Sequence, residues 1–218
     1  MVLFELKEAC ASYKGKQVLN RVSLKVGRGE KIALVGKSGA GKSTLLRLLY
    51  DSQIEECAFL PQNLGLVPNL SVFHNTFIGR LHKNSTFYNL ANLIRPLSNE
   101  KNAVLKVLKQ LELTDKIYSP VGELSGGQQQ RAGIARALYQ ACNIFLGDEP
   151  VSAVDERQAR NVMETITSNH ETVVLAMHDV QLALSFCSRI IGLSSGKIIL
   201  DCQSDGMSSS DLAELYGN

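Results

Sequence analysis

Residues 36–43 restrict more than any other segment what this chain can fold into. They read Gly36-Lys37-Ser38-Gly39-Ala40-Gly41-Lys42-Ser43, which fits the pattern G-x-x-x-x-G-K-[ST]. A short apolar segment at 31–35 precedes them and a leucine-rich segment at 43–50 follows, so the context is strand, loop and helix. Glycines let such a loop wrap tightly, its backbone N–H groups point inward, and the helix N-terminus adds a partial positive charge. The segment therefore predicts an α/β chain with a phosphate site at the end of a strand.

Three side chains of this segment have separate expected roles. Lys42 is expected to reach the β and γ phosphates of a nucleotide, and the Ser43 hydroxyl is expected to bind Mg²⁺. Thr44 completes the predicted cradle at the start of the helix. A glycine-rich turn without any ligand is the alternative. The residues predicted to bind the nucleotide here are Gly36, Lys37, Ser38, Gly39, Ala40, Gly41, Lys42, Ser43 and Thr44.

In the segment Ile144–Glu149, a short apolar stretch is followed by two carboxylates, Asp148 and Glu149. In open α/β sheets, ligands bind beyond the carboxyl ends of the strands, which is where these carboxylates are expected. Asp148 is placed to hold Mg²⁺, directly or through water. Glu149 is placed to polarise a water for attack on the γ phosphate. A turn after a strand is often acidic, so this interpretation depends on the glycine loop as well.

A second glycine pair begins another predicted helix. The segment Leu124-Ser125-Gly126-Gly127-Gln128 places a hydroxyl and two unhindered backbone N–H groups at a helix start, and Ser125 and Gln128 have capping-box spacing. One chain thus carries two helix starts suited to phosphate. Because one nucleotide has only one triphosphate, we expect this second site to serve a nucleotide held by another copy.

The remaining pattern predicts strands that alternate with helices, which implies a parallel sheet covered on both faces. Residues 51–100 are expected to be rich in loops, and their sequence does not allow individual elements to be assigned. Ser195-Gly196 is expected to close a hairpin between 190–194 and 197–200. The other expected strands are 22–26, 31–35, 144–146 and 172–177, and the other expected helices are 43–50, 101–111, 155–168, 180–187 and one that begins at Gly126.

Composition excludes several classes of protein. The chain has 218 residues, 44% of them hydrophobic, and a formal net charge of +2, which argues against a disordered chain and a dedicated nucleic-acid binder. Its longest run without charged residues includes all of 58–79, which contains prolines and asparagines and does not resemble a bilayer span. Acidic residues interrupt the first ten positions, unlike a signal peptide. We therefore expect a cytoplasmic protein whose membrane role, if any, depends on a partner.

Taken together, these motifs resemble the nucleotide-binding subunit of an ATP-binding cassette (ABC) transporter. Gly36–Ser43 is similar to the Walker A motif of that family, Leu124–Gln128 to its signature, and Ile144–Glu149 to its Walker B motif. Ser152–Asp155 is similar to the D-loop, with Val154 where the family more often has Leu. The motifs occur in the order of the family.

Three further residues gain a role from this resemblance. Gln62 matches the Q-loop glutamine, His178 the switch histidine, and Tyr13 the aromatic residue that stacks on adenine. Each has an alternative: Gln62 could be an ordinary loop residue, His178 a core histidine and Tyr13 an edge-strand aromatic. The implied catalytic residues are Glu149, His178 and Gln62, and the implied Mg²⁺ ligands are Ser43, Gln62 and Asp148.

The resemblance implies a P-loop NTPase fold of the ABC ATPase type: a mostly parallel central sheet, N-terminal antiparallel strands and a helical subdomain. Residues 1–218 would form one ABC ATPase domain, with its core in 1–62 and 142–218 and its helical subdomain at about 63–141. Two copies would pair head to tail around ATP and Mg²⁺, with Ser125, Gly126, Gly127 and Gln128 of one copy completing the site on the other. The protein would lie on the inner face of the cell membrane, bound to transmembrane permease subunits and served indirectly by a solute-binding protein.

Several segments outside these motifs resemble the ATPases of phosphonate importers. They are Asn75–Leu81, Ala159–Met163, Arg189–Leu193 and Ser210–Gly217. One feature departs from the family: Lys42 and Gln62 are only 20 residues apart, where the family usually has a longer segment that forms part of an antiparallel subdomain.

Other functions remain open at this point. A soluble ABC ATPase of division, repair or translation, or the ATPase of an export complex, would carry the same motifs. A non-catalytic nucleotide-binding regulator is disfavoured because both Glu149 and His178 are present. The apolar side chains of Leu66, Val67, Leu70, Val72 and Phe73 are expected either to pack the helical insertion or to form a groove for a permease helix.

Overall fold

The computed structural model describes residues 1–13, 15–53, 57–208 and 211–212. The chain divides into two compact units, each described separately below. The first comprises Met1–Gln62, Asn143–Pro150 and Ile166–Asn218, and the second comprises Asn63–Cys142 and Val151–Thr165. Within the described ranges, no helix has the length and hydrophobicity needed to cross a lipid bilayer.

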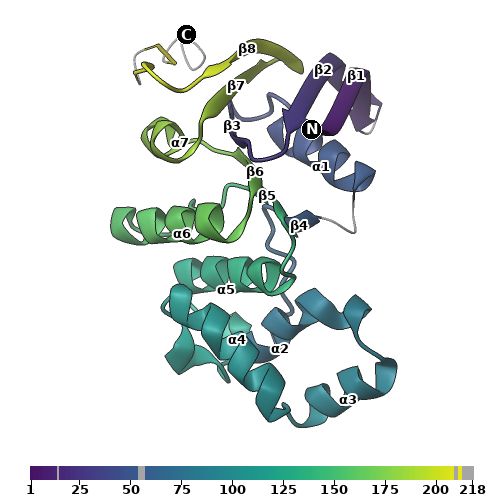
Figure 1. Cartoon of the computed structure of the whole chain (residues 1–218), viewed down its shortest axis with the longest axis vertical. Helices are drawn as coiled ribbons and strands as arrows, with labels where there is room; N and C mark the ends of the chain where they lie inside the picture. The colour runs from purple at the N-terminus through teal and green to yellow at the C-terminus, as the bar shows by residue number, and fades with distance from the viewer. Residues whose placement is uncertain (14, 54–56, 209–210, 213–218) are drawn as a thin grey trace. The chain divides into compact units, whose positions relative to one another are not determined.

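A six-stranded sheet forms the centre of the first unit (Figure 1). All strands run parallel except β8, which pairs antiparallel with β7. The three innermost-paired strands β5, β6 and β3 are almost entirely buried, as expected where helices cover both faces. The expected mostly parallel sheet is therefore confirmed. In spatial order, its strands are β4 (Cys57–Leu60), β5 (Ile144–Asp148), β6 (Thr172–Ala176), β3 (Lys31–Val35), β7 (Arg189–Ser194) and β8 (Lys197–Gln203).

Two helices of the first unit flank this sheet. Helix α1 (Lys42–Ser52) follows β3, and α7 (Val180–Phe186) connects β6 to β7. Because their crossovers lead from β3 toward β4 and from β6 toward β7, in opposite directions along the sheet, right-handed connections place the helices on opposite faces. The leucines of α1, Leu45, Leu46 and Leu49, are fully buried, as expected of a core-facing stripe.

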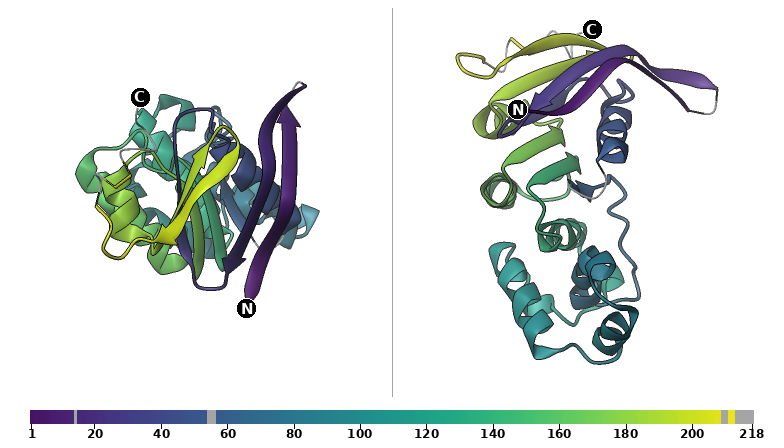
Figure 2. Two further views of the ribbon diagram at one scale, coloured as in Figure 1. Left: turned by 90° about the horizontal axis from the view of Figure 1, so that it is seen from above. Right: turned by 45° about the vertical axis from the view of Figure 1, so that its right-hand side comes forward.

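The N-terminal strands form a separate antiparallel sheet, which confirms that part of the expected fold. Strands β1 (Val2–Tyr13) and β2 (Lys16–Gly27) make a long hairpin (Figure 2). Buried and exposed residues alternate from Val22 to Val26, as the sequence predicts for a strand with one solvated face. The hairpin contributes to a single hydrophobic core with α1 and the central sheet; its members include Phe4, Leu19, Val22, Leu24, Val26, Ile32, Leu34, Leu45, Leu46, Leu49, Leu146 and Val174.

The predicted C-terminal hairpin is also present. Ser195 and Gly196 join β7 to β8 with φ values of 46° and 75°, the pair of left-handed residues that a tight two-residue turn requires. A Cβ atom at Gly196 would lie 2.2 Å from the carbonyl oxygen of Val18, so this position accepts only glycine. The backbone N–H of Asn20 donates to the Gly196 carbonyl at 2.9 Å, which ties β2 to the turn.

Helices dominate the second unit. Phe73 of α2 and Phe77 stack with ring centroids 5.9 Å apart inside it. Glu100 of α4 accepts hydrogen bonds from the hydroxyls of Tyr88 in α3 and Tyr139 in α5, which joins three helices. Its elements are α2 (Val72–Phe77), η1 (Ile78–Lys83), α3 (Thr86–Ile94), α4 (Ser98–Gln110), η2 (Thr114–Lys116), η3 (Val121–Glu123), α5 (Gly126–Tyr139) and the part of α6 (Glu156–Asn169) up to Thr165.

The expectation that residues 51–100 are rich in loops is wrong. The segment contains β4, α2, η1, α3 and the beginning of α4. Helix α2 is only six residues long and α3 nine, and serine caps mark the starts of both. The hydroxyl of Ser71 accepts from the His74 N–H and that of Ser85 from the Tyr88 N–H, each at 3.3 Å. Ser71 and Ser85, the residues before α2 and α3, are therefore the sequence features that indicate these two helix starts.

Candidate nucleotide site

Four connections of the first unit meet at the carboxyl edge of its sheet. β3 ends at the glycine loop, β4 two residues before Gln62, β5 directly before Glu149, and β6 two residues before His178. Since these strands are parallel neighbours, their ends lie together. They surround a pocket of about 200 Å³ lined by Val18, Ser38, Gly39, Gly41, Lys42, Ser43, Thr44, Gln62, Glu149 and His178.

The backbone of the glycine loop requires glycine at its two ends. Gly36 and Gly41 have φ values of 141° and 107°, which residues with a side chain rarely adopt. A Cβ atom would lie 2.2 Å from the Leu193 carbonyl oxygen at Gly36, and 2.6 Å from the Leu19 Cδ2 atom at Gly41. The Ala40 N–H donates to the Lys37 carbonyl at 3.1 Å and closes the loop between them.

Lys42 points back into this loop. Its ammonium donates to the carbonyls of Gly36 at 2.7 Å and Lys37 at 3.2 Å, and the residue is 6% exposed. Burial lowers the pKa of Lys42, while the negative charges of Glu149 and Asp148 act in the opposite direction. A desolvated ammonium that donates to loop carbonyls can exchange these acceptors for phosphate oxygens, which offer it a full negative charge.

Asp148 lies beside Ser43 and is 5% exposed. Burial raises the pKa of Asp148, and a hydrogen bond with the Ser43 side chain acts against that rise. In the described part of the chain, no group of three or more His, Cys, Asp or Glu side chains could hold a metal ion. The oxygens of Ser43, Asp148 and Gln62 instead fit Mg²⁺, which takes one or two carboxylates and fills its other positions with phosphate and water.

Glu149 and His178 form a pair at the other side of the pocket. The Glu149 Oε1 and His178 Nε2 atoms are 2.9 Å apart. Glu149 has a φ of 53°, and its backbone N–H donates to the carbonyl of Ala176 at 3.0 Å. A left-handed backbone is unfavourable for glutamate, and such strain is often found at functional sites. Glu149 and His178 line the same pocket as the glycine loop.

Not every residue predicted for this site lines the pocket. Gly36, Lys37 and Ala40 shape the loop, and Asp148 lies beneath it against Ser43. Tyr13 is 68% exposed at the end of β1 and is not among the lining residues. Val18 lines the pocket without having been predicted, because its position depends on the fold of β2 against the loop and on no local motif.

The second predicted helix start lies in the second unit. The Ser125 hydroxyl accepts from the Gln128 N–H at 3.4 Å and the Gln128 side chain accepts from the Ser125 N–H at 3.0 Å, which confirms the predicted capping box. Ser125 and Gly126 are exposed. A Cβ atom at Gly127 would lie 2.8 Å from the Ala153 carbonyl oxygen, so the segment 152–155 packs directly on this helix start.

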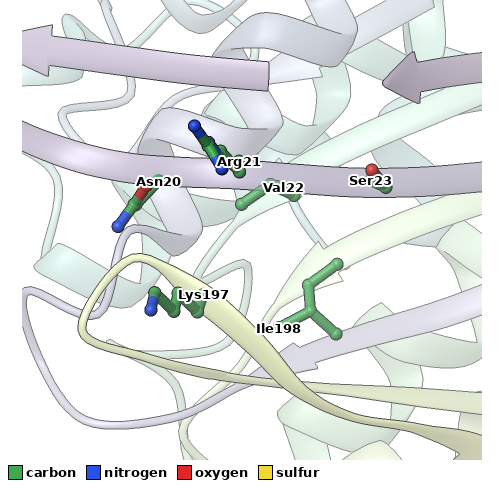
Figure 3. Close-up of a pocket in the computed structure, with 6 residues that line it drawn as sticks. All are labelled: Asn20, Arg21, Val22, Ser23, Lys197 and Ile198. Carbon is green, nitrogen blue, oxygen red and sulfur yellow. The ribbon is translucent and has the colours of Figure 1, made fainter. Parts of the chain in front are cut away.

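A further hollow in the first unit lies between β2 and β8. It is lined by Asn20, Arg21, Val22, Ser23, Lys197 and Ile198. Figure 3 shows that Asn20 points toward the turn that carries Lys197, whereas Arg21 points to the other side of β2. The two cations do not converge on one position, and we assign no ligand to this hollow.

The fold and the pocket define a P-loop NTPase: a glycine loop between β3 and α1 lies opposite an aspartate–glutamate pair at the end of β5. The family model described as ABC transporter matches residues 19–152, more than half of the chain. The chain belongs to the ABC transporter family, and it is an ATPase of the ATP-binding cassette type.

Curated relatives match almost the whole chain. The phosphonates import ATP-binding protein PhnC of Rhizobium etli is 32% identical over 244 aligned positions, which cover 99% of this chain and 86% of the relative. PhnC of Pseudomonas entomophila is 36% identical, covering 98% and 91%. The first alignment exceeds the 218 residues of this chain by 26 positions (244 − 218), so that relative has at least this many residues without a counterpart here.

Solved structures give the same family. A dimeric ATP-binding cassette, MJ0796, in a post-hydrolysis state bound to ADP and Pi, is 27% identical, with a TM-score of 0.81 over 95% of this chain and 100% of that chain. A second dimeric structure of the same cassette has a TM-score of 0.79 at 26% identity.

Proposed function

We propose that this protein hydrolyses ATP to power the import of phosphonate, or a related phosphorus oxyanion, through a separate membrane permease. The observation that supports the solute most directly is that several relatives covering 98–99% of the chain are phosphonates import ATP-binding proteins. The segments Asn75–Leu81, Ala159–Met163 and Arg189–Leu193 support it further through the resemblance noted above. Of the fourth segment, Ser210–Gly217, only residues 211 and 212 are among the described ones.

In this proposal the first-unit pocket holds the triphosphate of ATP. The backbone N–H groups of residues 36–44 and the Lys42 ammonium bind the β and γ phosphates, and Tyr13 stacks on the adenine. Ser43, Asp148 and Gln62 hold Mg²⁺, which when bound neutralises charge on those phosphates. Glu149 Oε1 accepts the proton of the attacking water, and His178 hydrogen-bonds to the γ phosphate or to that water.

We propose further that two copies share each ATP. Ser125, Gly126, Gly127 and Gln128 of one copy would complete the site that Lys42 of the other copy begins. The exposure of Ser125 and Gly126 supports this role, because these helix-start groups face solvent in the single chain. The assembled pair would lie on the cytoplasmic face of the membrane beneath the permease, with a solute-binding protein on the other side and no nucleic acid involved.

The groove that the sequence suggests for a permease helix cannot include all of the residues named for it. Val72 and Phe73 are 0% exposed and pack inside the second unit, so they cannot line a docking groove. An apolar groove of about 360 Å³ lies nearby in the same unit. We propose that it receives a short permease helix. Its lining residues are Leu70, His74, Phe77, Ile78, Leu81, Thr86, Asn89, Leu90 and Leu93.

Two features of this groove support a protein partner. Leu90 and Leu93 are 52% and 50% exposed, which leaves a substantial apolar surface in water. Among the described residues, the buried His74 Nε2 and Asn89 Oδ1 atoms have no hydrogen-bond partner. A helix that buries the leucines and brings a polar group to these two atoms would remove both defects.

The partner is tested by substituting Leu90→Asp in the tagged full-length protein and recovering it with its membrane fraction. We expect the permease to be lost while ATP binding stays normal. The matched control is Ile199→Asp on β8, where the replaced side chain is similarly exposed at 55%. Association that survives Leu90→Asp would contradict the groove, and the absence of any multi-span protein in the wild-type complex would favour a non-transport ABC ATPase.

The solute is tested by growth of the source cell on methylphosphonate as the only phosphorus source. We expect a Lys42→Ala strain to fail on methylphosphonate and to grow on inorganic phosphate. Equal growth of mutant and wild type on methylphosphonate would contradict phosphonate as the solute while leaving the ATPase assignment intact.

A further inference from the structure

A half-buried arginine holds the turn that follows Gln62. Arg136, in the last turn of α5, donates from Nη1 to the Gly65 carbonyl at 2.6 Å and from Nη2 to the Leu64 carbonyl. Burial lowers the pKa of the Arg136 guanidinium. The guanidinium binds two neighbouring backbone oxygens at once. The planar, forked guanidinium of arginine suits this arrangement, and the single ammonium of lysine cannot reproduce it.

The turn held by Arg136 is strained. The Gly65 N–H donates to the Asn63 carbonyl at 2.6 Å, two residues back, and Leu64 between them has a φ of 56°. Gly65 also has a φ of 56°. A three-residue turn with a positive φ at its centre is rare, and a left-handed leucine costs on the order of 1–2 kcal/mol. The two bonds from Arg136 offset this cost and fix the turn in one conformation.

The part of α5 that carries Arg136 is itself closely packed. A Cβ atom at Gly79 of η1 would lie 2.4 Å from the Arg136 carbonyl oxygen, so the two segments touch through their backbones. The Arg80 guanidinium lies over the Tyr139 ring at 4.5 Å, and the Lys83 ammonium donates to the Gln140 carbonyl at 2.8 Å. The turn is thus attached to a rigid body that includes all of α5, whose first residue follows Ser125.

We propose that Arg136 is the positioning residue that makes the turn after Gln62 a rigid extension of helix α5. The strained turn begins at Asn63, directly after Gln62. A displacement of Gln62 therefore passes along the chain to Leu64 and Gly65, then through the guanidinium to α5 and to its Ser125 end. Without this clamp, the turn would absorb the displacement. The inference rests on the proposed roles of Gln62 and Ser125, and it assigns Arg136 the link between them.

Amide hydrogen exchange of the full-length protein, with and without ATP, tests this link. In the wild type we expect ATP to change exchange in the glycine loop and across residues 126–139. In Arg136→Met, ATP should still protect the loop, with a dissociation constant within about threefold, but exchange across 126–139 should no longer respond. Steady-state kcat should fall by about tenfold while KM changes little. The matched control is Arg160→Met, which removes an exposed arginine of α6 paired with Glu156.

A purely structural role for Arg136 predicts a different result. ATP binding would then weaken in parallel with thermal stability, and the response of 126–139 would remain; either finding overturns the inference. Should Arg136→Met fail to fold, Arg136→Lys decides, because it keeps the charge but can serve only one of the two carbonyls.

A double-substitution cycle separates this inference from the proposed role of Gln62. If Arg136 acts through Gln62, Gln62→Ala combined with Arg136→Met should be no slower than the slower single variant. Multiplying effects would contradict the link, whereas a Gln62→Ala variant with normal turnover would contradict the proposed function of Gln62 itself.

Discussion

At the scale of single residues, the first-unit pocket places opposite charges in an environment that favours neither. Lys42 and Asp148 are both almost inaccessible to solvent, and burial shifts the pKa of each toward its neutral form. Folding in the absence of ligand therefore works against these two charges, and in the proposed function phosphate and Mg²⁺ would place an opposite charge beside each of them. Pockets arranged for tight ligand binding commonly carry such a cost in stability.

The first prediction concerns Asp148→Asn and pH. Because the pKa of Asp148 is raised on folding, the folded chain holds the proton more strongly, and its carboxyl contributes stability below its ordinary pKa that is lost as pH rises through the raised value. The asparagine lacks this dependence. The melting temperature of the nucleotide-free variant, relative to wild type, should therefore be higher at pH 7 than at pH 4. A difference that is constant over this range would contradict the burial argument.

The second prediction concerns Glu149→Gln. The amide keeps the shape of the side chain and can still contact His178, but it cannot accept a proton from water. ATP should bind normally while kcat falls by roughly 10² or more, the usual scale for losing a positioned base. Single-turnover measurements check this directly. Hydrolysis within a fewfold of wild type would show that another group accepts the proton.

At the scale of elements, both proposed phosphate sites lie at helix starts that contain glycine. Their glycines are not equivalent. In α5, a Cβ atom at Gly127 would lie 2.8 Å from the Ala153 oxygen and 3.3 Å from the Val154 Cγ1 atom, whereas one at Gly126 would meet only the Ala153 Cβ atom at an ordinary 3.8 Å. The first contact is shorter than real Cβ contacts, so the backbone would have to move.

The third prediction follows from this difference. Gly127→Ala should lower the free energy of unfolding by about 1–3 kcal/mol, the usual cost of overpacking. Gly126→Ala should leave it unchanged or slightly raised, since alanine favours a helix by up to about 1 kcal/mol. Chemical denaturation measures the free energy of unfolding of the two variants, which are matched because each adds one methyl group. Equal stability would contradict the packing of residues 153–154 on the helix start.

The same elements show how far sequence reasoning reaches. The glycine loop, the capping box at Ser125 and the Ser195-Gly196 hairpin were predicted because each depends on local backbone chemistry. Helix α3 was missed although Ser85 caps its start and Phe87, Leu90 and Ile94 lie at helical spacing. The complete burial of Phe73 could not be predicted, since it depends on the packing of the folded second unit. Val18 escaped prediction for the same reason: only the packed fold brings its strand to the loop.

At the scale of the whole molecule, one chain carries two phosphate-type helix starts, one in each compact unit. The Lys42 loop belongs to the first unit and the Ser125 cap to the second. One ATP has one triphosphate, and in the proposed function each copy therefore lends its Ser125 site to the ATP held by the other copy. A related cassette, MJ0796, has been solved as a dimer. The helical subdomain predicted at about 63–141 stays a prediction.

The most direct test is the mass of the Glu149→Gln protein at saturating ATP and Mg²⁺, measured by light scattering with and without Ser125→Arg. We predict twice the mass of one chain with ATP and a single chain without it. Adding Ser125→Arg should abolish the pair, because its side chain fills the space of the partner's γ phosphate, while each chain still binds ATP at Lys42. A pair that survives Ser125→Arg, or a single chain at saturating ATP, would contradict the shared site.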